Sequence, residues 1–275
     1  MGSEKQGFIW LSGLLFLNIF VLSTADVHYY EFSLQESPFT KLCSTKIILA
    51  LNGSFPGPEI RVRRGDTVSV NVHNQANYAV SLDWEGVEDT IEGSNNTIQP
   101  GRNFTYNIEL GDEIGTLRWH ATSAWAAATV HGAFVILPVA NEDYPFPAPT
   151  SDQTIILDAY TINGHPGETY GCSNDTTFEM QVDYQGLYLV RVINAVANET
   201  MLFDIEKHRL TIVGQNGTYT NRSFTSSLTL APGQVIDVLL CPNQNVGRYY
   251  ITARSSSGRH ITNGILRYTT TTTSF

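Results

Sequence analysis

Two short segments of the chain carry carboxylates and an imidazole at spacings that could bring them together. Residues 83–86 read Asp-Trp-Glu-Gly, and residues 119–122 read Trp-His-Ala-Thr. Successive side chains of a β-strand point to opposite faces, so Asp83 and Glu85 share one face if this segment is a strand. His120 and Thr122 have the same spacing. Two carboxylates beside an imidazole form an acid–base set, because like charges at close range push their pKa values apart.

The sequence leaves other roles open for these residues. Two carboxylates and His120 could in principle hold a manganese, zinc or iron ion, since carboxylates favour harder ions than copper. Trp84, Thr122 and Trp125 are weaker candidates for contacts with a substrate. His131 joins the set only if it faces the same way. In the simplest alternative this face meets water, where Asp and Glu are favoured residues.

The elements that must position these residues are β-strands, and we predict an all-β fold. Short runs rich in Val, Ile, Thr and aromatic residues lie between Gly, Pro and Asn turns, without convincing helical periodicity after residue 25. Val68, Val70 and Val72 alternate with polar residues, as in a strand with one buried face. Further strands are predicted at 47–51, 104–110, 129–137, 187–193, 210–213, 235–240 and 249–253.

The chain repeats one set of landmarks. An Asn-Gly turn at 52–53 recurs at 163–164, a strand ending at Asn74 recurs ending at Asn194, and a Pro-Gly turn at 100–101 recurs at 232–233. In both halves another glycine follows fourteen residues after the Pro-Gly glycine. The shared order implies two copies of one β unit.

The two units are joined by a stretch of alternating prolines. Within residues 138–150, Pro145, Pro147 and Pro149 alternate with other residues. Proline stiffens a linker and denies hydrogen-bond donors to a sheet. We therefore predict two tandem β-sandwich domains, residues 26–140 and 141–275.

Longer motifs around the two segments resemble those of plant laccases, which are secreted multicopper oxidases. The similarity is carried by Arg-Gly-Asp-Thr-Val at 64–68, Gly-Thr-Leu at 115–117 and Ala-Thr-Val-His-Gly-Ala at 128–133. It covers nearly the whole chain after residue 25. Laccases are built of Greek-key cupredoxin sandwiches, so the resemblance implies the same architecture as the strand pattern.

The resemblance also implies copper, but the ligand positions are changed. In laccases the two segments would read His-Trp-His-Gly and Trp-His-Ala-His, so His120 is the only one of four expected imidazoles that is retained. A third cupredoxin domain, which supplies the other ligands, would begin where this chain ends. The family's Asp for proton delivery and a cysteine, near Asn96 here, are also absent. We therefore expect no copper cofactor and no four-electron reduction of oxygen.

The first residues and the sequons predict a secreted glycoprotein. Lys5, an apolar run over 8–22 and Ser-Thr-Ala at 23–25 are typical of a signal peptide, predicted at 1–25. The mature protein is then expected to be extracellular, in the apoplast, without a membrane span. Seven Asn-x-Ser/Thr sequons indicate glycosylation. They are Asn52, Asn95, Asn103, Asn174, Asn198, Asn216 and Asn221.

The chain has three cysteines, an odd number. In an oxidising compartment Cys43 and Cys172 could pair, one near the start of each half, and the laccase resemblance points to the same disulfide. Cys241 is then left over in an apolar run. There we expect a small buried hydrophobic residue, with a free thiol or an intermolecular bridge as the alternative.

The net charge and the laccase resemblance together limit the functions that the sequence allows. A net charge of −10, with 16 Lys and Arg against 26 Asp and Glu, argues against nucleic-acid and membrane partners. The sequence favours a copper-free laccase-like pseudoenzyme that binds a phenolic ligand, a laccase or another cell-wall protein. A homo-oligomer would equally cover the face that a third domain leaves, since large apolar patches rarely stay exposed. The alternatives are a non-oxidative acid–base enzyme for plant metabolites, using Asp83, Glu85 and His120, and an inactive truncated remnant.

Overall fold

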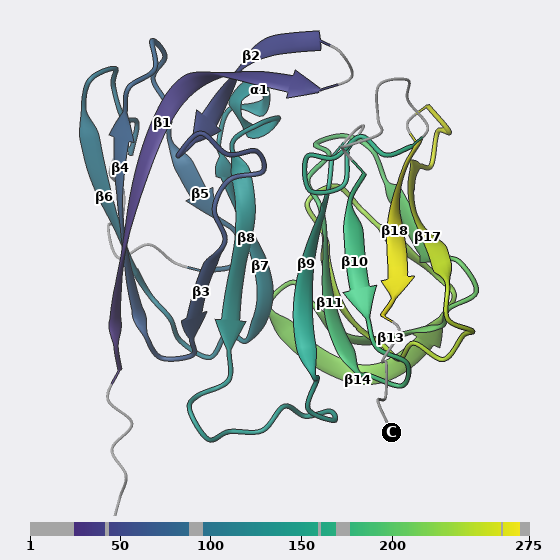
Figure 1. Ribbon diagram of the computed structural model, residues 1–275. Coiled ribbons are helices and arrows are strands. Elements are labelled where there is room, and N and C mark those ends of the chain that lie inside the picture. Colours follow the sequence, from purple (N-terminus) through teal and green to yellow (C-terminus); the bar gives the residue numbers. More distant parts are fainter. Residues whose placement is uncertain are drawn as a thin grey trace, which may run out of the picture.

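The computed structural model describes residues 25–41, 44–87, 96–158, 161–168, 177–259 and 261–269. Over these residues the chain forms β-strands and one short helical turn, α1 (Ala124–Ala127). Two β-sandwiches lie side by side and are joined by the proline-containing segment 138–150 (Figure 1). The predicted all-β fold of two tandem sandwiches is confirmed.

The first sandwich has two four-stranded sheets within the described residues. Its strands are β1 (Val27–Lys41), β2 (Ser44–Leu51), β3 (Ile60–Arg63), β4 (Thr67–Asn74), β5 (Leu82–Trp84), β6 (Asn103–Glu109), β7 (Gly115–Ala121) and β8 (His131–Leu137). The sheet orders are β2-β1-β4-β6 and β3-β8-β7-β5. Alternate side chains of β4 are buried, as the valine pattern predicts.

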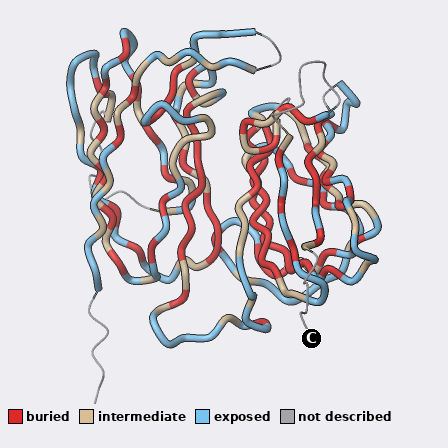
Figure 2. Tube along the Cα trace, in the orientation of Figure 1, coloured by how far each residue is buried: buried red, intermediate tan, exposed pale blue. Residues whose placement is uncertain are grey.

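The second sandwich has two five-stranded sheets within the described residues. Its strands are β9 (Ser151–Leu157), β10 (Glu179–Val182), β11 (Tyr188–Asn194), β12 (Met201–Ile205), β13 (Leu210–Gln215), β14 (Thr218–Thr225), β15 (Ser227–Leu230), β16 (Val235–Leu240), β17 (Arg248–Ser255) and β18 (Ile261–Tyr268). The sheet orders are β14-β13-β16-β11-β9 and β10-β18-β17-β12-β15. Each sandwich has its own apolar core, visible as buried stretches along the strands (Figure 2).

The repeat in the sequence is also a structural repeat. Asn74 and Asn194 end equivalent buried strands, and each side-chain amide donates to the carbonyl three residues before a Pro-Gly glycine. The N–H groups of Gly101 and Gly233 donate back to the two asparagine carbonyls at 2.8 and 3.0 Å. Both glycines have φ above 70°, a region that other residues rarely adopt. The same side-chain bonds therefore close the same turn in both domains.

The outer face of sheet β3-β8-β7-β5 packs against the second sandwich. Ala133 and Val135 of β8 form a buried apolar cluster with Ile156, Ile193 and Val235 of the second domain. A backbone link adds to it, because the N–H of Gly217 donates to the carbonyl of Thr116 at 2.9 Å. The same sheet face therefore carries the interdomain contact on β8 and the predicted site residues on β5 and β7.

A buried arginine completes this interdomain contact. Arg191 of β11 is 0% exposed. It donates to the hydroxyl of Thr116 at 2.8 Å and to Asp152 at 3.0 Å, and it lies 3.6 Å from Asp237. Buried polar groups are costly without partners, so these bonds fix the relative position of the two sheets.

Some predictions fall outside the described residues, and the prediction for Cys241 is wrong. The signal peptide up to residue 24, both partners of the predicted disulfide (Cys43 and Cys172) and the sequons Asn95 and Asn174 are not described. Cys241 was expected to be buried, but it is exposed and unpaired. The buried strand β16 ends at Leu240, so Cys241 lies just beyond the apolar run. In the described part of the chain no helix is long and apolar enough to cross a membrane.

Candidate functional site

The predicted site residues meet on the outer face of β5 and β7. The two strands are antiparallel, and Asp83 pairs with His120 in register. The burial of β5 alternates, with Asp83 exposed between buried Leu82 and Trp84, as the strand prediction requires. The backbone N–H of Glu85 donates to the carbonyl of Arg118, which extends the pairing by one residue. Asp83 and Glu85 therefore lie beside His120 and Arg118 on one surface.

Glu85 is the centre of an ion-pair cluster. Its carboxylate accepts two hydrogen bonds from the guanidinium of Arg118, at 2.5 and 3.2 Å. The Nε2 atom of His120 lies 3.1 Å from the same carboxylate and 3.6 Å from that of Asp83. The side chains of Arg118 and His120 are 11% and 17% exposed, against 33% for Glu85 and 56% for Asp83. The cations are thus covered, while the carboxylates reach solvent.

The hydrogen bonds of His120 favour its charged form. Its Nδ1 donates to the carbonyl oxygen of Ala121 at 2.7 Å. Nε2 can then donate to Glu85 only if the ring carries two protons. The hydrogen bond to Glu85 raises the pKa of His120, an effect larger than the lowering due to burial. For Glu85, burial would raise the pKa, but the bonds from His120 and Arg118 outweigh it and the pKa is lowered.

Arg118 is a site residue that the sequence reasoning did not identify. It lies two residues before His120 on β7, so it shares the outer face by strand alternation. This two-residue spacing from His120 is visible in the sequence and could have identified Arg118. Its two bonds to Glu85 change the chemistry expected of this face, because one of the two carboxylates is already paired with a permanent cation.

Thr122 and Trp125 lie at the other end of the same face. The hydroxyl of Thr122 is 2.6 Å from that of Ser81, so Thr122 pairs across the strands instead of joining the carboxylates. Trp125 is 52% exposed and Tyr78 is 47% exposed. Their rings meet edge to face, with centroids 5.0 Å apart. An exposed aromatic pair thus closes this end of the face.

Trp84 is not available to a substrate, contrary to the prediction. It is 4% exposed and packs against Tyr106, Trp119 and Phe134 in the core of the first sandwich. The reason is strand alternation, which turns Trp84 inward between two outward carboxylates.

His131 faces the same side of the sheet but does not join the cluster. It pairs in register with His120. Its ring is 1% exposed, and Nδ1 donates to the carbonyl of Ala127 at 2.8 Å. Nε2 lies 2.9 Å from a carboxylate oxygen of Asp158, without hydrogen-bond alignment. The second sandwich covers this part of the face.

A groove of about 500 Å³ borders the ion-pair cluster. Glu85, Arg118 and Leu117 form one side, and the turn 231–235 of the second sandwich forms the other. The turn comes close, since a Cβ on Gly233 would lie 3.1 Å from Nη2 of Arg118. Small molecules can therefore approach Glu85 between the two domains.

Comparison with solved structures defines the class of the fold. The chain is similar to the laccase of Botrytis aclada, with a TM-score of 0.75 and 22% identity over 92% of this chain and 55% of that one. It is also similar to the copper nitrite reductase of Nitrosomonas europaea, with a TM-score of 0.75 and 17% identity over 90% and 95% of the two chains. These likenesses show the fold, which is a tandem pair of cupredoxin sandwiches.

Sequence comparison identifies the family. Multicopper oxidase family models match residues 33–141 and 140–272. Laccase-14 of Arabidopsis thaliana is 38% identical over 89% of this chain and 49% of its own length. Laccase-3 of Oryza sativa subsp. japonica is 38% identical over 86% and 47%. The chain belongs to the multicopper oxidase family, as the laccase resemblance predicted, and it spans about half the length of these curated relatives.

The family implies copper, but the residues present here do not suit it. Copper sites of oxidases are built from imidazole and thiolate, whereas this face offers His120 and two carboxylates. The guanidinium of Arg118 already binds Glu85, and a fixed cation repels a metal ion at the same carboxylate. In the described part of the chain, no three His, Cys, Asp or Glu side chains are placed to hold one ion.

Proposed function

We propose that this chain is a laccase-like protein that binds phenolic compounds without copper. The observation that carries the proposal is the Arg118–Glu85–His120 cluster. Two covered cations satisfy the carboxylate at the position where the family's ligands would lie. The cluster therefore neutralises itself without a metal. Secretion and glycosylation are part of the proposal and are supported by the leading segment and the sequons.

Metal analysis tests the proposal that the protein binds no copper. Protein purified from its secreted form is incubated with excess Cu(II), passed through a chelating resin and analysed for copper per chain. We expect no retained copper that depends on His120. One or more equivalents in the wild type, lost in His120→Ala but kept in the exposed control His73→Ala, would overturn the proposal.

The phenolic ligand is placed at the exposed aromatic pair Tyr78–Trp125. Aromatic rings in edge-to-face contact still offer free faces on which a phenol can stack. The hydroxyls of Ser81 and Thr122 lie next along the face, three residues from Tyr78 and Trp125 respectively. They provide donors and acceptors for a phenolic hydroxyl.

Indole NMR signals test this placement. Trp84 and Trp119 are buried, so Trp125 is the exposed indole of the described chain. On addition of guaiacol we expect its Nε1–H signal to shift with saturation, while those of Trp84 and Trp119 stay in place. Trp125→Ala should weaken binding several-fold and Trp125→Phe should retain most of it, with cyclohexanol as the non-aromatic control ligand. Binding that is unchanged in Trp125→Ala would refute this site.

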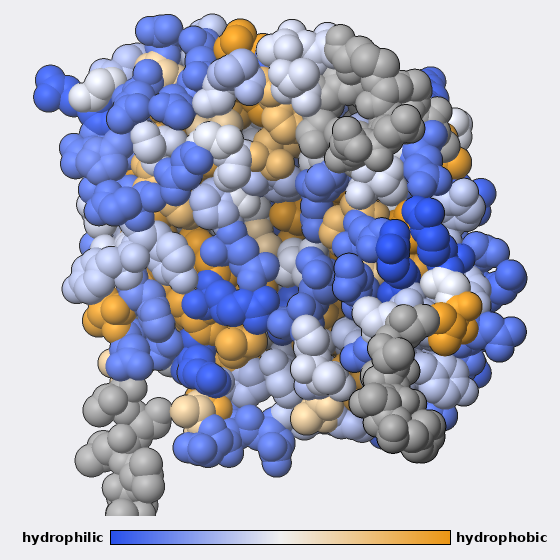
Figure 3. Space-filling model, viewed as in Figure 1, coloured by the Kyte–Doolittle hydropathy of each residue, from blue (hydrophilic) through white to orange (hydrophobic). Residues whose placement is uncertain are grey.

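Protein partners are a further part of the proposal. Apart from the Tyr78–Trp125 pair, the uncovered residues of the β5–β7 face, Ser81, Thr122 and Asp83, are polar, so no large apolar patch motivates a partner there. Apolar side chains on the face seen in Figure 3 occur in separate groups among polar ones. A cell-wall protein or a second copy of the chain would therefore bind mainly through polar contacts. Light scattering after size-exclusion chromatography tests the second copy, and a strict monomer excludes it.

A second candidate is a non-oxidative acid–base enzyme. It is motivated by the contact between Nε2 of His120 and Glu85 at 3.1 Å, which places an imidazole next to a carboxylate beside an open groove. Asp83, exposed and 3.6 Å from His120, could receive a proton from solvent. Replacing Asp83 by Asn and Glu85 by Gln should then abolish turnover of phenolic esters while the protein stays folded. Turnover that survives both changes would exclude this reading.

A further inference from the structure

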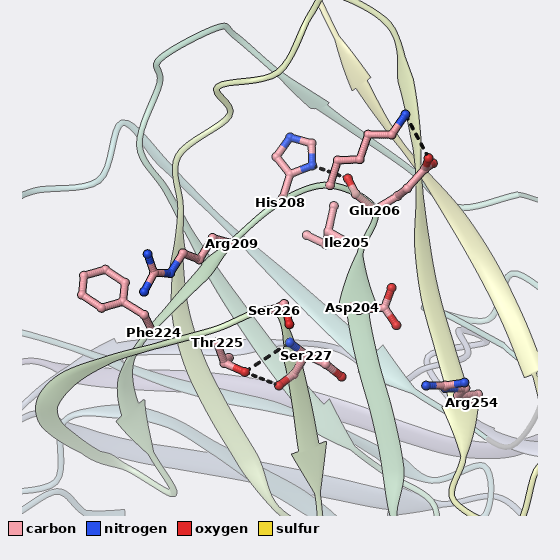
Figure 4. Close-up of a pocket in the computed structure, with 11 residues that line it drawn as sticks. Asp204, Ile205, Glu206, His208, Arg209, Phe224, Thr225, Ser226, Ser227 and Arg254 are labelled. Carbon is pink, nitrogen blue, oxygen red and sulfur yellow. Dashed lines mark hydrogen bonds and ion pairs between the residues drawn. The ribbon is translucent and has the colours of Figure 1, made fainter.

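A second groove lies on the second sandwich, on residues that the proposed phenolic site does not use. It is lined by the turn between β12 and β13, the connection between β14 and β15, and Arg254 of β17 (Figure 4). Its volume is about 830 Å³. Binding sites for small molecules usually have volumes of roughly 300–1,000 Å³. The groove is therefore large enough for a ligand of several rings.

Two arginines lie on opposite sides of this groove. Arg209 is beside Phe224, with its guanidinium carbon 4.4 Å from the ring centroid, and Arg254 is beside Asp204 (Figure 4). Among the described residues, neither guanidinium has a hydrogen-bond or ion-pair partner. A guanidinium has five N–H donors in a planar fork that matches a carboxylate. Stacking on Phe224 holds the fork of Arg209 in place before any ligand arrives.

Hydroxyls and one acceptor lie between the two arginines. The hydroxyl of Thr225 donates to the carbonyl of Ser227 at 2.6 Å and accepts its N–H, which fixes the connection that carries Ser226 and Ser227. Asp204 adds a carboxylate to the lining, and Phe224 is 62% exposed. The groove thus offers donors, acceptors and an exposed aromatic ring together.

The charge of this groove differs from that of the whole chain. The net charge of the chain is −10. Lys207 is paired with Glu206 at 3.4 Å, and the charge of Arg254 is opposed by the nearby Asp204, so Arg209 carries the excess positive charge of the groove. Burial lowers the pKa of His208, and its ring points away toward Tyr268. His208 itself is 4% exposed.

We propose that this groove binds a carboxylated oligosaccharide, with at least two uronic acid units. Each arginine would bind one carboxylate. Because the arginines lie on opposite sides of the groove, a ligand with two uronic acid units fits them better than a ligand with one. Asp204, Ser226 and Ser227 would bind sugar hydroxyls, and Phe224 would stack on the apolar face of a sugar ring. A neutral sugar would leave both arginines unpaired, and an inorganic anion would leave the hydroxyls and the ring unused.

Calorimetric titration of the secreted protein with trigalacturonate tests the proposal. We expect saturable binding that weakens about tenfold in Arg209→Ala and in Arg254→Ala, the usual effect of losing one charge-assisted pair. Arg209→Lys should bind less tightly than the wild type, because lysine keeps the charge but loses the fork and the stacking. Arg222→Ala is the matched control, since Arg222 is exposed on the same strand β14 but does not line the groove.

Three outcomes would overturn the proposal. The first is the absence of binding at millimolar trigalacturonate. The second is equal weakening in Arg222→Ala, which would indicate diffuse surface charge. The third is equal binding of the fully methyl-esterified trimer or of free sulfate, which would exclude recognition of a carboxylated sugar. Circular dichroism of each variant confirms that the exposed substitutions leave the fold intact.

Discussion

Two clusters on the same pair of facing sheets consist of similar groups and have different roles. Arg118, Glu85 and His120 form one cluster at the open edge of the first sandwich. Arg191, Asp152 and Asp237 form the other between the sandwiches. Arg191 is 0% exposed, whereas Glu85 is 33% exposed. The difference teaches that burial, more than the residue types, decides whether charges join two domains or stay open to solvent.

The buried cluster should be the more sensitive of the two. Removing one partner of a buried pair leaves an uncompensated charge and costs about 3–5 kcal/mol, whereas exposed pairs contribute about 0–1 kcal/mol. The buried cluster also joins the domains, because Arg191 binds Thr116 of the first sandwich. The open cluster lies within one sheet and borders a groove.

The largest effect is expected for Arg191→Met. It leaves the buried Asp237 without its cation, so the free energy of unfolding should fall by about 3–5 kcal/mol. Urea denaturation monitored by Trp fluorescence measures this change. Arg61→Met is the matched control, because Arg61 also binds Asp152 but its side chain is 38% exposed. A loss below about 1 kcal/mol for Arg191→Met would show that the two clusters do not differ as proposed.

A change of intermediate size is expected in the titration of His120. NMR should give a pKa above its ordinary 6.5, and Glu85→Gln should bring it back toward that value or below, because the largest raising cause is lost while burial and the charge of Arg118 still lower the pKa. The raised pKa contributes stability that is present below pH 6.5 and is lost as pH rises through the folded value. The lowered pKa of Glu85 contributes stability that is present above pH 4.5 and is lost as pH falls through its folded value.

The stabilisation by the open cluster should therefore be greatest between about pH 4.5 and pH 6.5. Urea denaturation of the wild type and Glu85→Gln across this range measures it as the difference between the two proteins. The coupling of His120 to Glu85 would be refuted by a difference in the free energy of unfolding that does not change with pH. It would also be refuted by a His120 pKa that is the same in the wild type and in Glu85→Gln.

The smallest effect is expected for Asp83→Asn. The carboxylate is 56% exposed and lies 3.6 Å from His120, beyond a normal hydrogen bond. The free energy of unfolding should change by no more than about 0.5 kcal/mol, as for most surface substitutions. A larger loss in thermal or urea denaturation would mean that Asp83, and not Glu85 alone, holds His120.

Most of the fold could be predicted from local pattern. Period-2 alternation gave the strand of Val68, Val70 and Val72, and the recurring asparagine and Pro-Gly turn gave the two-domain repeat. Several strands were missed, among them β14, whose residues are mostly exposed. A strand at the edge of a sheet can be exposed on both faces, so it needs no alternation of apolar residues. The sequence of such a strand therefore gives little indication that it is a strand.

The candidate site was predicted only in part. Strand alternation correctly placed Asp83 and Glu85 on one face, but the same rule turns Trp84 inward and adds Arg118. Cys241 was misplaced because an apolar run does not show at which residue the chain reaches the surface.

The sequence by itself determined the fold class, the repeat, the family resemblance and the loss of imidazoles, because these depend on residue type and spacing along one strand. Only the tertiary structure decided which charges pair. Arg118 with Glu85, Arg191 with Asp152, and the unpaired Arg209 and Arg254 around one groove follow from strand register and domain packing. These contacts join residues tens of positions apart, and no local pattern encodes them.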